Sequence, residues 1–184
     1  GILISLAPAF LSISLLIRIL DGKPVLFKQK RIGQFGRTFT IYKFRTMVQN
    51  AEALMQNERN IHGRNHYLFK DHDDPRVTRL GKFLRRSSID EFPQFFNVLL
   101  GNMSVVGPRP ALPTEVKKYD SIYERRLIAK PGITGPWQIG GRSDLDRQTS
   151  VALDLNYLLH WSFHKDLVYV LNTIGSIVRG KGAY

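Results

Sequence analysis

The first twenty residues are almost wholly apolar, and they constrain the fold more than any other segment. They read GILISLAPAFLSISLLIRIL, with Arg18 as the one charged side chain. A helix of about 20 apolar residues is just long enough to cross a bilayer. Pro8 removes a backbone donor in the middle of the segment and kinks a helix there, and Arg18 can extend to the membrane surface. The segment predicts a bent helix that enters one leaflet and returns. A buried core helix of a soluble domain is the alternative.

The charge balance indicates an anionic partner. The 184 residues carry a formal net charge of +12, which suits nucleic acid, a phospholipid surface or a phosphorylated substrate. The chain contains no cysteine, which excludes disulfides and cysteine-based zinc sites. Its length is sufficient for one domain with a real core.

The segment after the apolar run predicts a basic β-hairpin. Residues 22–51 contain seven basic side chains and no acidic one. Apolar residues alternate on both sides of Gly33 and Gly36, namely Val25, Phe27, Phe39 and Ile41. This pattern predicts two strands with a glycine-containing turn between them. We expect the hairpin to lie beside lipid headgroups or phosphates, with a solvated charged face as the alternative.

The rest of the chain is dominated by helical patterns, which predicts an α+β fold that is mainly α and rich in amphipathic helices. Residues 47–60 predict a surface helix. The next helix carries an apolar side composed of Val77, Leu80, Phe83 and Leu84, with arginines in its last turn. Ser88 to Glu91 has the spacing of a capping box before a helix that ends at Gly101.

The C-terminal segment predicts one more amphipathic helix, capped by Ser162 and ended by Gly180. Its apolar stripe consists of Phe163, Leu167, Val170, Leu171, Ile174, Ile177 and Val178. We expect this stripe either to attach to the membrane or to face the core. Two histidine pairs have helical ligand spacing, but neither has a third ligand, so we expect surface or structural histidines: His62, His66, His160 and His164.

An isolated acidic pair lies inside a basic stretch. Asp90 and Glu91 are the only acidic residues between positions 75 and 114, which contain Arg76, Arg79, Lys82, Arg85, Arg86 and Arg109. Acids are common at a helix N-terminus, where they complement the helix dipole. Arginines, however, favour the ionised carboxylate, which is a poor general acid but suits a nucleophile or a Mg²⁺ ligand. Arginine forks also match phosphate oxygens, so the stretch indicates a diphosphate site.

Arg109 lies between Pro108 and Pro110. Two prolines restrict the local backbone, so this arginine is presented in a set direction. A rigid loop with a solvated arginine is the alternative.

Four blocks stand in a fixed order along the chain: KFRTM (43–47), DPRVTRLGKFLRRSSIDEFPQFFNVLLGNMSVVGPRP (74–110), KPGITGPWQIGGR (130–142) and LDLNYLLHWSFHKDL (153–167). With these blocks and its apolar start, nearly the whole chain resembles the bacterial sugar transferases, the monotopic phosphoglycosyl transferases. These enzymes move a sugar 1-phosphate from a UDP-sugar to polyprenyl (undecaprenyl) phosphate.

The resemblance implies roles for individual residues. Asp90 matches the nucleophile of the family, Glu91 its partner in magnesium binding, and Pro8 the proline that breaks the re-entrant membrane helix. Ala7 stands where the family usually has a serine, so a hydroxyl contribution to that break is absent here. The candidates for the phosphates and the nucleotide are Arg85, Arg86, Arg109 (in the Pro-Arg-Pro motif of the family) and Arg142.

The implied reaction has two steps, in which Asp90 attacks the β-phosphorus and expels UMP before the lipid phosphate resolves the aspartyl-phosphosugar. The implied cofactor is Mg²⁺, and galactose or glucose is the favoured sugar. Residues 1–22 would form the re-entrant helix and 23–184 the catalytic domain, on the cytoplasmic face of the bacterial inner membrane. We expect anionic lipids but no nucleic acid as partners, with a homodimer as one alternative. We also expect a longer protein that begins surface polysaccharide or glycan assembly.

Two other functions remain open from the residues alone. A basic nucleic-acid-binding module accounts for the charge and the aromatic residues, but it leaves the apolar start and the acidic pair unexplained. A phosphatase or hydrolase acting on polyprenyl phosphate would use water instead of the lipid phosphate to resolve the intermediate.

Overall fold

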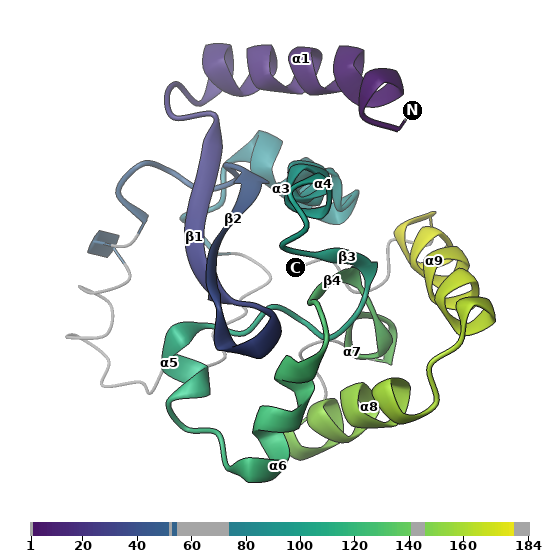
Figure 1. The fold of residues 1–184 in the computed structure, drawn as a ribbon. Coiled ribbons are helices and arrows are strands. Elements are labelled where there is room, and N and C mark those ends of the chain that lie inside the picture. Colours follow the sequence, from purple (N-terminus) through teal and green to yellow (C-terminus); the bar gives the residue numbers. More distant parts are fainter. Residues whose placement is uncertain (1, 52, 55–73, 141–145, 179–184) are drawn as a thin grey trace. The chain divides into compact units, whose positions relative to one another are not determined.

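The computed structural model describes residues 2–51, 53–54, 74–140 and 146–178 (Figure 1). In this part the chain is mainly helical with two small two-stranded sheets, which confirms an α+β fold that is mainly α. The N-terminal half contains α1 (Ile2–Leu20), β1 (Leu26–Ile32), η1 (Gln34–Gly36), β2 (Thr38–Phe44), α3 (Arg79–Arg86), η2 (Ile89–Glu91) and α4 (Gln94–Leu99). The C-terminal half contains β3 (Ser104–Val106), α5 (Pro113–Val116), α6 (Ser121–Glu124), η3 (Arg125–Ile128), β4 (Gly132–Thr134), α7 (Pro136–Gly140), α8 (Arg147–Leu159) and α9 (Phe163–Val178).

Two compact units make up the chain. The described residues of 1–27 and 44–92 belong to the first unit, and those of 28–43 and 93–182 belong to the second unit. This division does not follow the predicted boundary between residues 22 and 23, and that boundary stays a prediction.

The first unit has a core built from α1, α3, the start of β1 and the end of β2. Its buried centre consists of Ile17, Phe44 and Leu84. Phe10, Ile13 and Ile17 of α1 are spaced by three and four residues, so they lie on one face of the helix, and the Phe10 and Phe44 rings are 4.7 Å apart between centroids. One face of the apolar helix therefore packs against this core.

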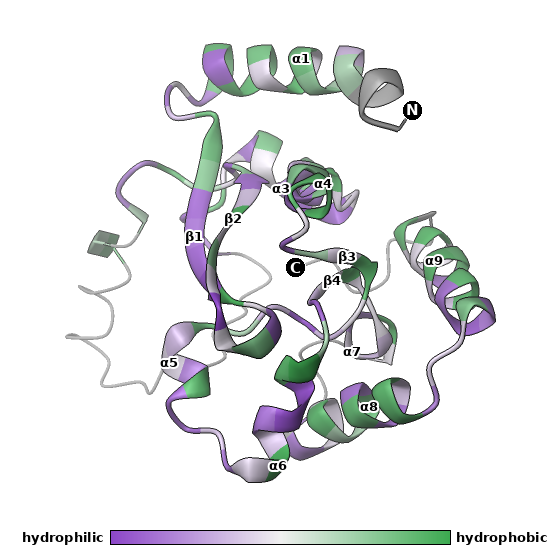
Figure 2. Ribbon diagram, in the orientation of Figure 1, coloured by the Kyte–Doolittle hydropathy of each residue, from purple (hydrophilic) through white to green (hydrophobic). Residues whose placement is uncertain are grey.

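The other face of α1 exposes large apolar side chains: Leu11, Leu15, Leu16, Ile19 and Leu20. Figure 2 shows α1 as predominantly hydrophobic and the neighbouring strand β1 as largely hydrophilic. Pro8 lies within α1, which continues from Ile2 to Leu20. Of the helices in the described residues, none is both long enough and apolar enough to cross a membrane.

Arg45 holds the end of α1. Its guanidinium donates hydrogen bonds to the carbonyl oxygens of Lys23 at 2.7 Å and Gly22 at 2.9 Å. Thr78 contributes from the other side, because its hydroxyl donates to the Asp21 carboxylate at 2.8 Å. The Gly22 and Lys23 carbonyls belong to the turn that follows α1, so Arg45 fixes the path of the chain as it leaves the helix. The KFRTM and DPRVT segments thus meet at the end of α1.

The helix predicted before the acidic pair is present as α3, but it begins after Val77 and exposes one of its apolar residues. It begins at Arg79, because Thr78 caps it by accepting a hydrogen bond from the Gly81 amide at 2.9 Å. Val77 lies outside the helix and pairs with Met47 in a β-bridge. Of the expected apolar side, Leu84 is fully buried, whereas Phe83 is 61% exposed.

The second unit combines two small sheets with short helices. β1 and β2 pair on either side of Gly33 and Gly36, and β3 pairs in parallel with β4. Asn97 of α4 is fully buried and bonds to β2: it donates to the Thr40 carbonyl at 2.7 Å and accepts from the Tyr42 amide at 3.2 Å. This side chain completes backbone hydrogen bonds that the two-stranded sheet leaves open.

Two predicted helix ends in the second unit are confirmed. Gly101 follows α4 with a φ of +75°, the left-handed conformation typical of a helix C-terminus. Ser162 precedes α9, and its hydroxyl accepts a hydrogen bond from the Lys165 amide at 3.3 Å. The predicted end of α9 at Gly180 lies outside the described residues, as does most of the helix predicted for residues 47–60.

Candidate active site

The acidic pair lies in η2, a short 3₁₀ turn that precedes α4. Asp90 and Glu91 are both partly buried. The predicted capping box is wrong: Ser88 makes no side-chain cap, and its backbone is left-handed with a φ of 53°. A capping residue normally has an extended backbone, which directs its side-chain oxygen at the first amides of the helix. The pair is therefore held by the turn between α3 and α4, and α4 itself begins only at Gln94.

Arg85 is one basic residue that interacts electrostatically with Asp90. It lies in the last turn of α3, where its Nε donates a hydrogen bond to the Thr46 hydroxyl at 2.9 Å. Burial lowers the pKa of Arg85, and the negative charge of Asp90, followed by that of Asp74, opposes this shift. Arg86 follows in the same turn and is exposed. The first unit thus combines Asp90, Glu91 and the two predicted arginines.

A buried ion pair supports this cluster. Arg76 binds both carboxylate oxygens of Asp74, with Nε–Oδ1 at 2.8 Å and Nη2–Oδ2 at 2.7 Å. The hydrogen bond from the Arg76 side chain lowers the pKa of Asp74, against the opposing effect of burial. Both oxygens of Asp74 are thereby engaged by Arg76.

Arg109 belongs to the second unit and is held on two sides. Its Nη1 lies 3.1 Å from Glu115 Oε1, and its guanidinium lies 5.1 Å from the centre of the Trp137 ring. Burial raises the pKa of Glu115, but Arg109 and a hydrogen bond from the Leu112 amide outweigh it, so the pKa falls below its usual value. Arg109 stays partly exposed, so a guanidinium is presented in a set direction, as the sequence predicts.

The backbone of Arg109 is held by a second buried ion pair. Arg126 donates to the Arg109 carbonyl at 3.3 Å and pairs with Asp154, a residue with no exposed surface. Burial raises the pKa of Asp154 to about 6, and the charges of Arg126 and Arg109 oppose the rise. Arg126 therefore links the Pro-Arg-Pro segment to α8.

The remaining predicted positions lie partly within and partly outside the described residues. Arg142, His62 and His66 lie outside the described residues. His160 is exposed, and its Nδ1 lies 2.8 Å from Asn156 Oδ1. Pro8 is exposed on α1.

The chemistry of the available side-chain oxygens indicates whether a Mg²⁺ ion suits this site. Within the residues that the structure describes, no three His, Asp or Glu side chains form a cluster able to hold a metal ion. Mg²⁺ is usually bound by one or two carboxylates together with substrate phosphates and water. The adjacent carboxylates of Asp90 and Glu91 fit that requirement, because the phosphates would supply the other ligands.

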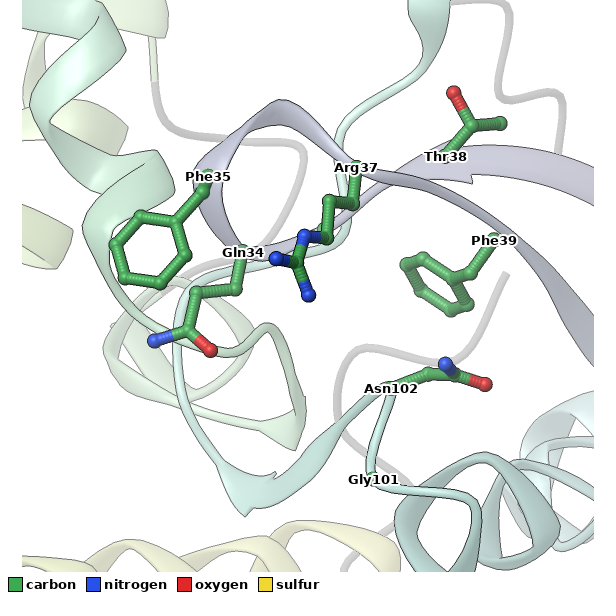
Figure 3. A pocket seen from close by; sticks show the side chains of 8 residues that line it. Gln34, Phe35, Arg37, Thr38, Phe39, Gly101 and Asn102 are labelled. Carbon is green, nitrogen blue, oxygen red and sulfur yellow. The ribbon is translucent and has the colours of Figure 1, made fainter.

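A separate hollow lies at the turn between β1 and β2, with a volume of about 220 Å³. Figure 3 shows the Arg37 side chain between those of Gln34 and Phe39, with Asn102 facing Phe39. No predicted site residue lines it.

Residue types alone did not indicate the contacts of the arginines, which involve Thr46, Glu115, Arg126, Trp137 and Asp154. Three of them lie inside the quoted blocks, as Thr46 of KFRTM, Trp137 of GPWQ and Asp154 of LDLNY. The sequence does indicate that Asp154 is a buried acidic residue, because it shares one helix face with the apolar Val151 and Tyr157.

Comparison with known proteins places the chain among relatives. The model of the bacterial sugar transferase family matches residues 1–180. The galactosyl transferase CpsE of Streptococcus agalactiae is 46% identical over 89% of this chain and 36% of its own length. The exopolysaccharide production protein ExoY of Sinorhizobium fredii is 41% identical over 99% of this chain and 82% of its own length.

A third relative is the undecaprenyl-phosphate galactose phosphotransferase of Salmonella typhimurium, which is 40% identical over 89% of this chain. The match covers 35% of that relative. The chain thus spans about a third of two of these relatives and most of ExoY.

Proposed function

The chain belongs to the bacterial sugar transferase family, and on this premise we propose that it transfers a sugar 1-phosphate from a UDP-sugar to undecaprenyl phosphate. The observation that carries the proposal is the acidic pair in η2 beside Arg85. An ionised carboxylate is suited to attack phosphorus, and a neighbouring arginine favours the ionised form. The names of two relatives, a galactosyl transferase and an undecaprenyl-phosphate galactose phosphotransferase, support the same reaction and make galactose the first sugar to test, with glucose next.

The proposed reaction uses Asp90 as the nucleophile. One carboxylate oxygen of Asp90 attacks the β-phosphorus of the UDP-sugar, and the bond from that phosphorus to the bridging oxygen breaks, which releases UMP. A phosphate oxygen of undecaprenyl phosphate then attacks the same phosphorus. The bond from phosphorus to Asp90 breaks, the carboxylate is regenerated, and the product is an undecaprenyl diphosphate sugar. One difficult displacement is thereby split into two easier ones.

Glu91 and the arginines would bind the charged groups that take part in the reaction. Glu91 would hold Mg²⁺, which supplies neutralisation of the charge on the leaving phosphate when it is bound. Arg85 and Arg86 would bind phosphate oxygens next to Asp90. Arg109 and Arg142 are further candidates for the phosphates and the nucleotide.

We also place the protein on the cytoplasmic face of the bacterial inner membrane, in a pathway that begins surface polysaccharide assembly. The exposed apolar face of α1 supports membrane attachment, and Pro8 supports a re-entrant path for residues 1–22. The seven basic residues between positions 22 and 51 suit an anionic lipid surface.

The test is an incubation of the protein with undecaprenyl phosphate and a panel of UDP-sugars, read out as UMP release and lipid product. We expect one sugar to give both products. UDP-sugar alone should add one hexose phosphate to the intact mass of the protein, and the label should map to the peptide that contains Asp90. Asp90→Asn should lack the label and both half-reactions, because an amide is no substitute for an ionised nucleophile.

Other outcomes would favour other functions. Free sugar phosphate without a lipid product would indicate a hydrolase. A label on a different residue, or a sequential mechanism without a burst of UMP, would overturn the role of Asp90. Nucleic-acid binding with no UMP release from any sugar would favour the basic binding module.

The role of Glu91 in magnesium binding has its own test. Glu91→Gln keeps the size of the side chain and removes its charge, so we expect lower activity and a higher magnesium requirement. The measurement is a magnesium titration of UMP release. Normal turnover of the variant over the whole titration would rule out Glu91 as the ligand.

A further inference from the structure

We propose that Thr46 is a positioning residue, whose hydroxyl fixes the guanidinium of Arg85 beside Asp90. This inference rests on the proposed function, because the nucleophilic role of Asp90 gives the position of Arg85 its importance. Thr46 is far from the acidic pair in sequence, and it has no part in the proposed reaction steps.

The contact joins a buried hydroxyl to one defined edge of the arginine. Arg85 Nε donates to Thr46 Oγ1 at 2.9 Å, and Thr46 is only 6% exposed. A guanidinium is planar, with Nε–H on one edge and the terminal NH₂ groups directed elsewhere. When Nε is held, the plane of the whole group is set, and the terminal groups stay available for a carboxylate or a phosphate.

The backbone of Thr46 is itself fixed against α3. Its carbonyl oxygen accepts a hydrogen bond from the Thr78 amide at 3.0 Å. Gly81 of α3 lies directly against it, since a Cβ at Gly81 would be 2.0 Å from that same carbonyl oxygen. Gly81 and Arg85 are four residues apart and so share one face of α3. The approach of that face to Thr46 therefore brings the Arg85 side chain to the Thr46 hydroxyl.

The surrounding charges indicate that Arg85 acts on Asp90 and not on Asp74. Two carboxylates influence Arg85, and the effect of Asp90 is larger than that of Asp74. Asp74 already binds Arg76 with both of its oxygens. Arg76 adds a positive charge that disfavours a second cation at Asp74. Arg85 therefore serves as a cation for Asp90, provided that its side chain keeps this orientation.

Loss of the hydroxyl should release this orientation. Arg85 Nε would lose its acceptor in a partly buried place, and the long side chain would gain rotamers. Outer-shell partners that orient metal ligands typically contribute 10- to 100-fold to affinity or activity, and we take the lower end for this arginine. We expect the rate constant for UMP formation to fall about 10-fold, with a smaller change in the KM for UDP-sugar.

The experiment compares Thr46→Val with Thr46→Ser in the full chain in detergent micelles, with UDP-galactose and the other UDP-sugars of the panel. Valine keeps the shape of threonine without the hydroxyl, whereas serine keeps the hydroxyl. We expect the valine variant to be about 10-fold slower in the UMP burst and the serine variant to be close to wild type. Thr114→Val, at an exposed position of α5, is the matched control and should change neither rate.

A double-mutant cycle separates positioning from a general structural effect. Arg85→Lys removes the Nε–H that Thr46 accepts, so Thr46→Val should cause little further loss of rate in the Arg85→Lys background. Independent structural damage would instead give additive losses. A full UMP rate in Thr46→Val, additive losses, or failure of serine to rescue a protein of unchanged melting temperature would each overturn the proposal.

A readout without catalysis keeps this inference distinct from the proposed function. In a ¹⁵N–¹H spectrum, the Arg85 Nε–H signal is assigned by its loss in Arg85→Lys. We expect this signal to be protected from solvent exchange in wild type and in Thr46→Ser, and to exchange rapidly in Thr46→Val. Equal exchange in all three proteins would refute the contact. Protected exchange in a protein that releases no UMP from any sugar would refute the proposed reaction, and with it the role of this contact.

Discussion

Gly81 brings two segments of the first unit into direct backbone contact. A Cβ at this position would lie 2.0 Å from the Thr46 carbonyl oxygen and 2.7 Å from its carbon, so α3 would have to move. We expect Gly81→Ala to lower the free energy of unfolding by about 3 kcal/mol, since overpacking against backbone leaves no flexible group to give way. UMP release should fall as well, because Arg85 moves with α3.

The matched control is Gly175→Ala in α9, where a Cβ meets nothing within 4 Å. Alanine is the better helix former by about 1 kcal/mol, so this variant should be slightly more stable than wild type. Urea denaturation of both variants measures the effect. Equal stability of the two proteins would contradict the close approach at Gly81.

The carboxyl group of Asp154 should give stability an unusual dependence on pH. Burial raises its pKa to about 6 from the ordinary value of 3.8. Between these two values the folded protein binds a proton that the unfolded chain has lost, so stability falls as pH rises. The contribution of Asp154 is therefore full below about pH 4 and is lost as pH rises through about 6, by about 3 kcal/mol in total.

The measurement is the difference in unfolding free energy between wild type and Asp154→Asn at several pH values. This difference should shrink as pH rises. Asp74 is the control with the opposite sign, because Arg76 lowers its pKa: the advantage of wild type over Asp74→Asn should be present above the ordinary pKa and be lost as pH falls through the lowered one. A constant difference for Asp154 would show that its pKa is not raised.

At the scale of elements, one buried amide joins α4 to β2. Asn97 bonds to the Thr40 carbonyl and the Tyr42 amide, and replacement by leucine would leave both backbone groups without these bonds. We expect Asn97→Leu to destabilise the protein by about 3 kcal/mol. Asn97→Asp keeps the acceptor and removes the donor, so it should cost less at a pH where the carboxyl is protonated. Chemical denaturation distinguishes these cases, and a neutral Asn97→Leu would exclude a structural role for the amide.

The apolar stripe predicted for α9 is mostly directed away from the second unit. Phe163, Leu167, Leu171 and Ile174 are all exposed, whereas Val170 and Ile177 are partly buried. This separation favours the surface role of the stripe over a place in the core of that unit.

A pair of neighbouring substitutions tests this surface role. We expect Leu171→Glu to weaken binding to vesicles that contain anionic lipid by about 10-fold, because it places a charge on the apolar face. Asn172→Glu adds the same charge at the next exposed position and should have a smaller effect. Vesicle co-sedimentation measures both. Equal losses would attribute the effect to charge alone.

At the scale of the whole molecule, the path of the first residues relative to the membrane is the main prediction. The chain has no cysteine, so single cysteines can be introduced at residue 1 and at residue 23, on either side of the apolar segment. If Pro8 bends the segment back, both positions should be labelled from the cytoplasmic side of oriented membrane vesicles. Labelling from opposite sides would replace the re-entrant path by a single span.

Local patterns predicted the parts of the fold that depend on neighbours in sequence. The mainly helical fold, the two strands around Gly33 and Gly36, the end of α4 at Gly101 and the cap of α9 at Ser162 all follow from the chemistry of short segments. The same reasoning failed at Ser88, because a left-handed backbone replaced the extended conformation that a capping residue needs. It does not account for the exposure of Phe83, because a helical stripe does not specify how much of it the neighbouring elements cover.

The sequence by itself determined the family, and with it the chemistry that we propose, since an acidic pair among arginines and an ordered set of blocks are properties of residue order. Only the tertiary structure decided which groups orient that chemistry. The contact of Thr46 with Arg85 joins residues 39 positions apart, and that of Arg126 with Asp154 joins residues 28 apart. Such contacts depend on the packing of whole elements, here the approach of α3 at Gly81 and the burial of one face of α8. Side-chain periodicity reports the face of an element, but the partner across that face is set by the fold.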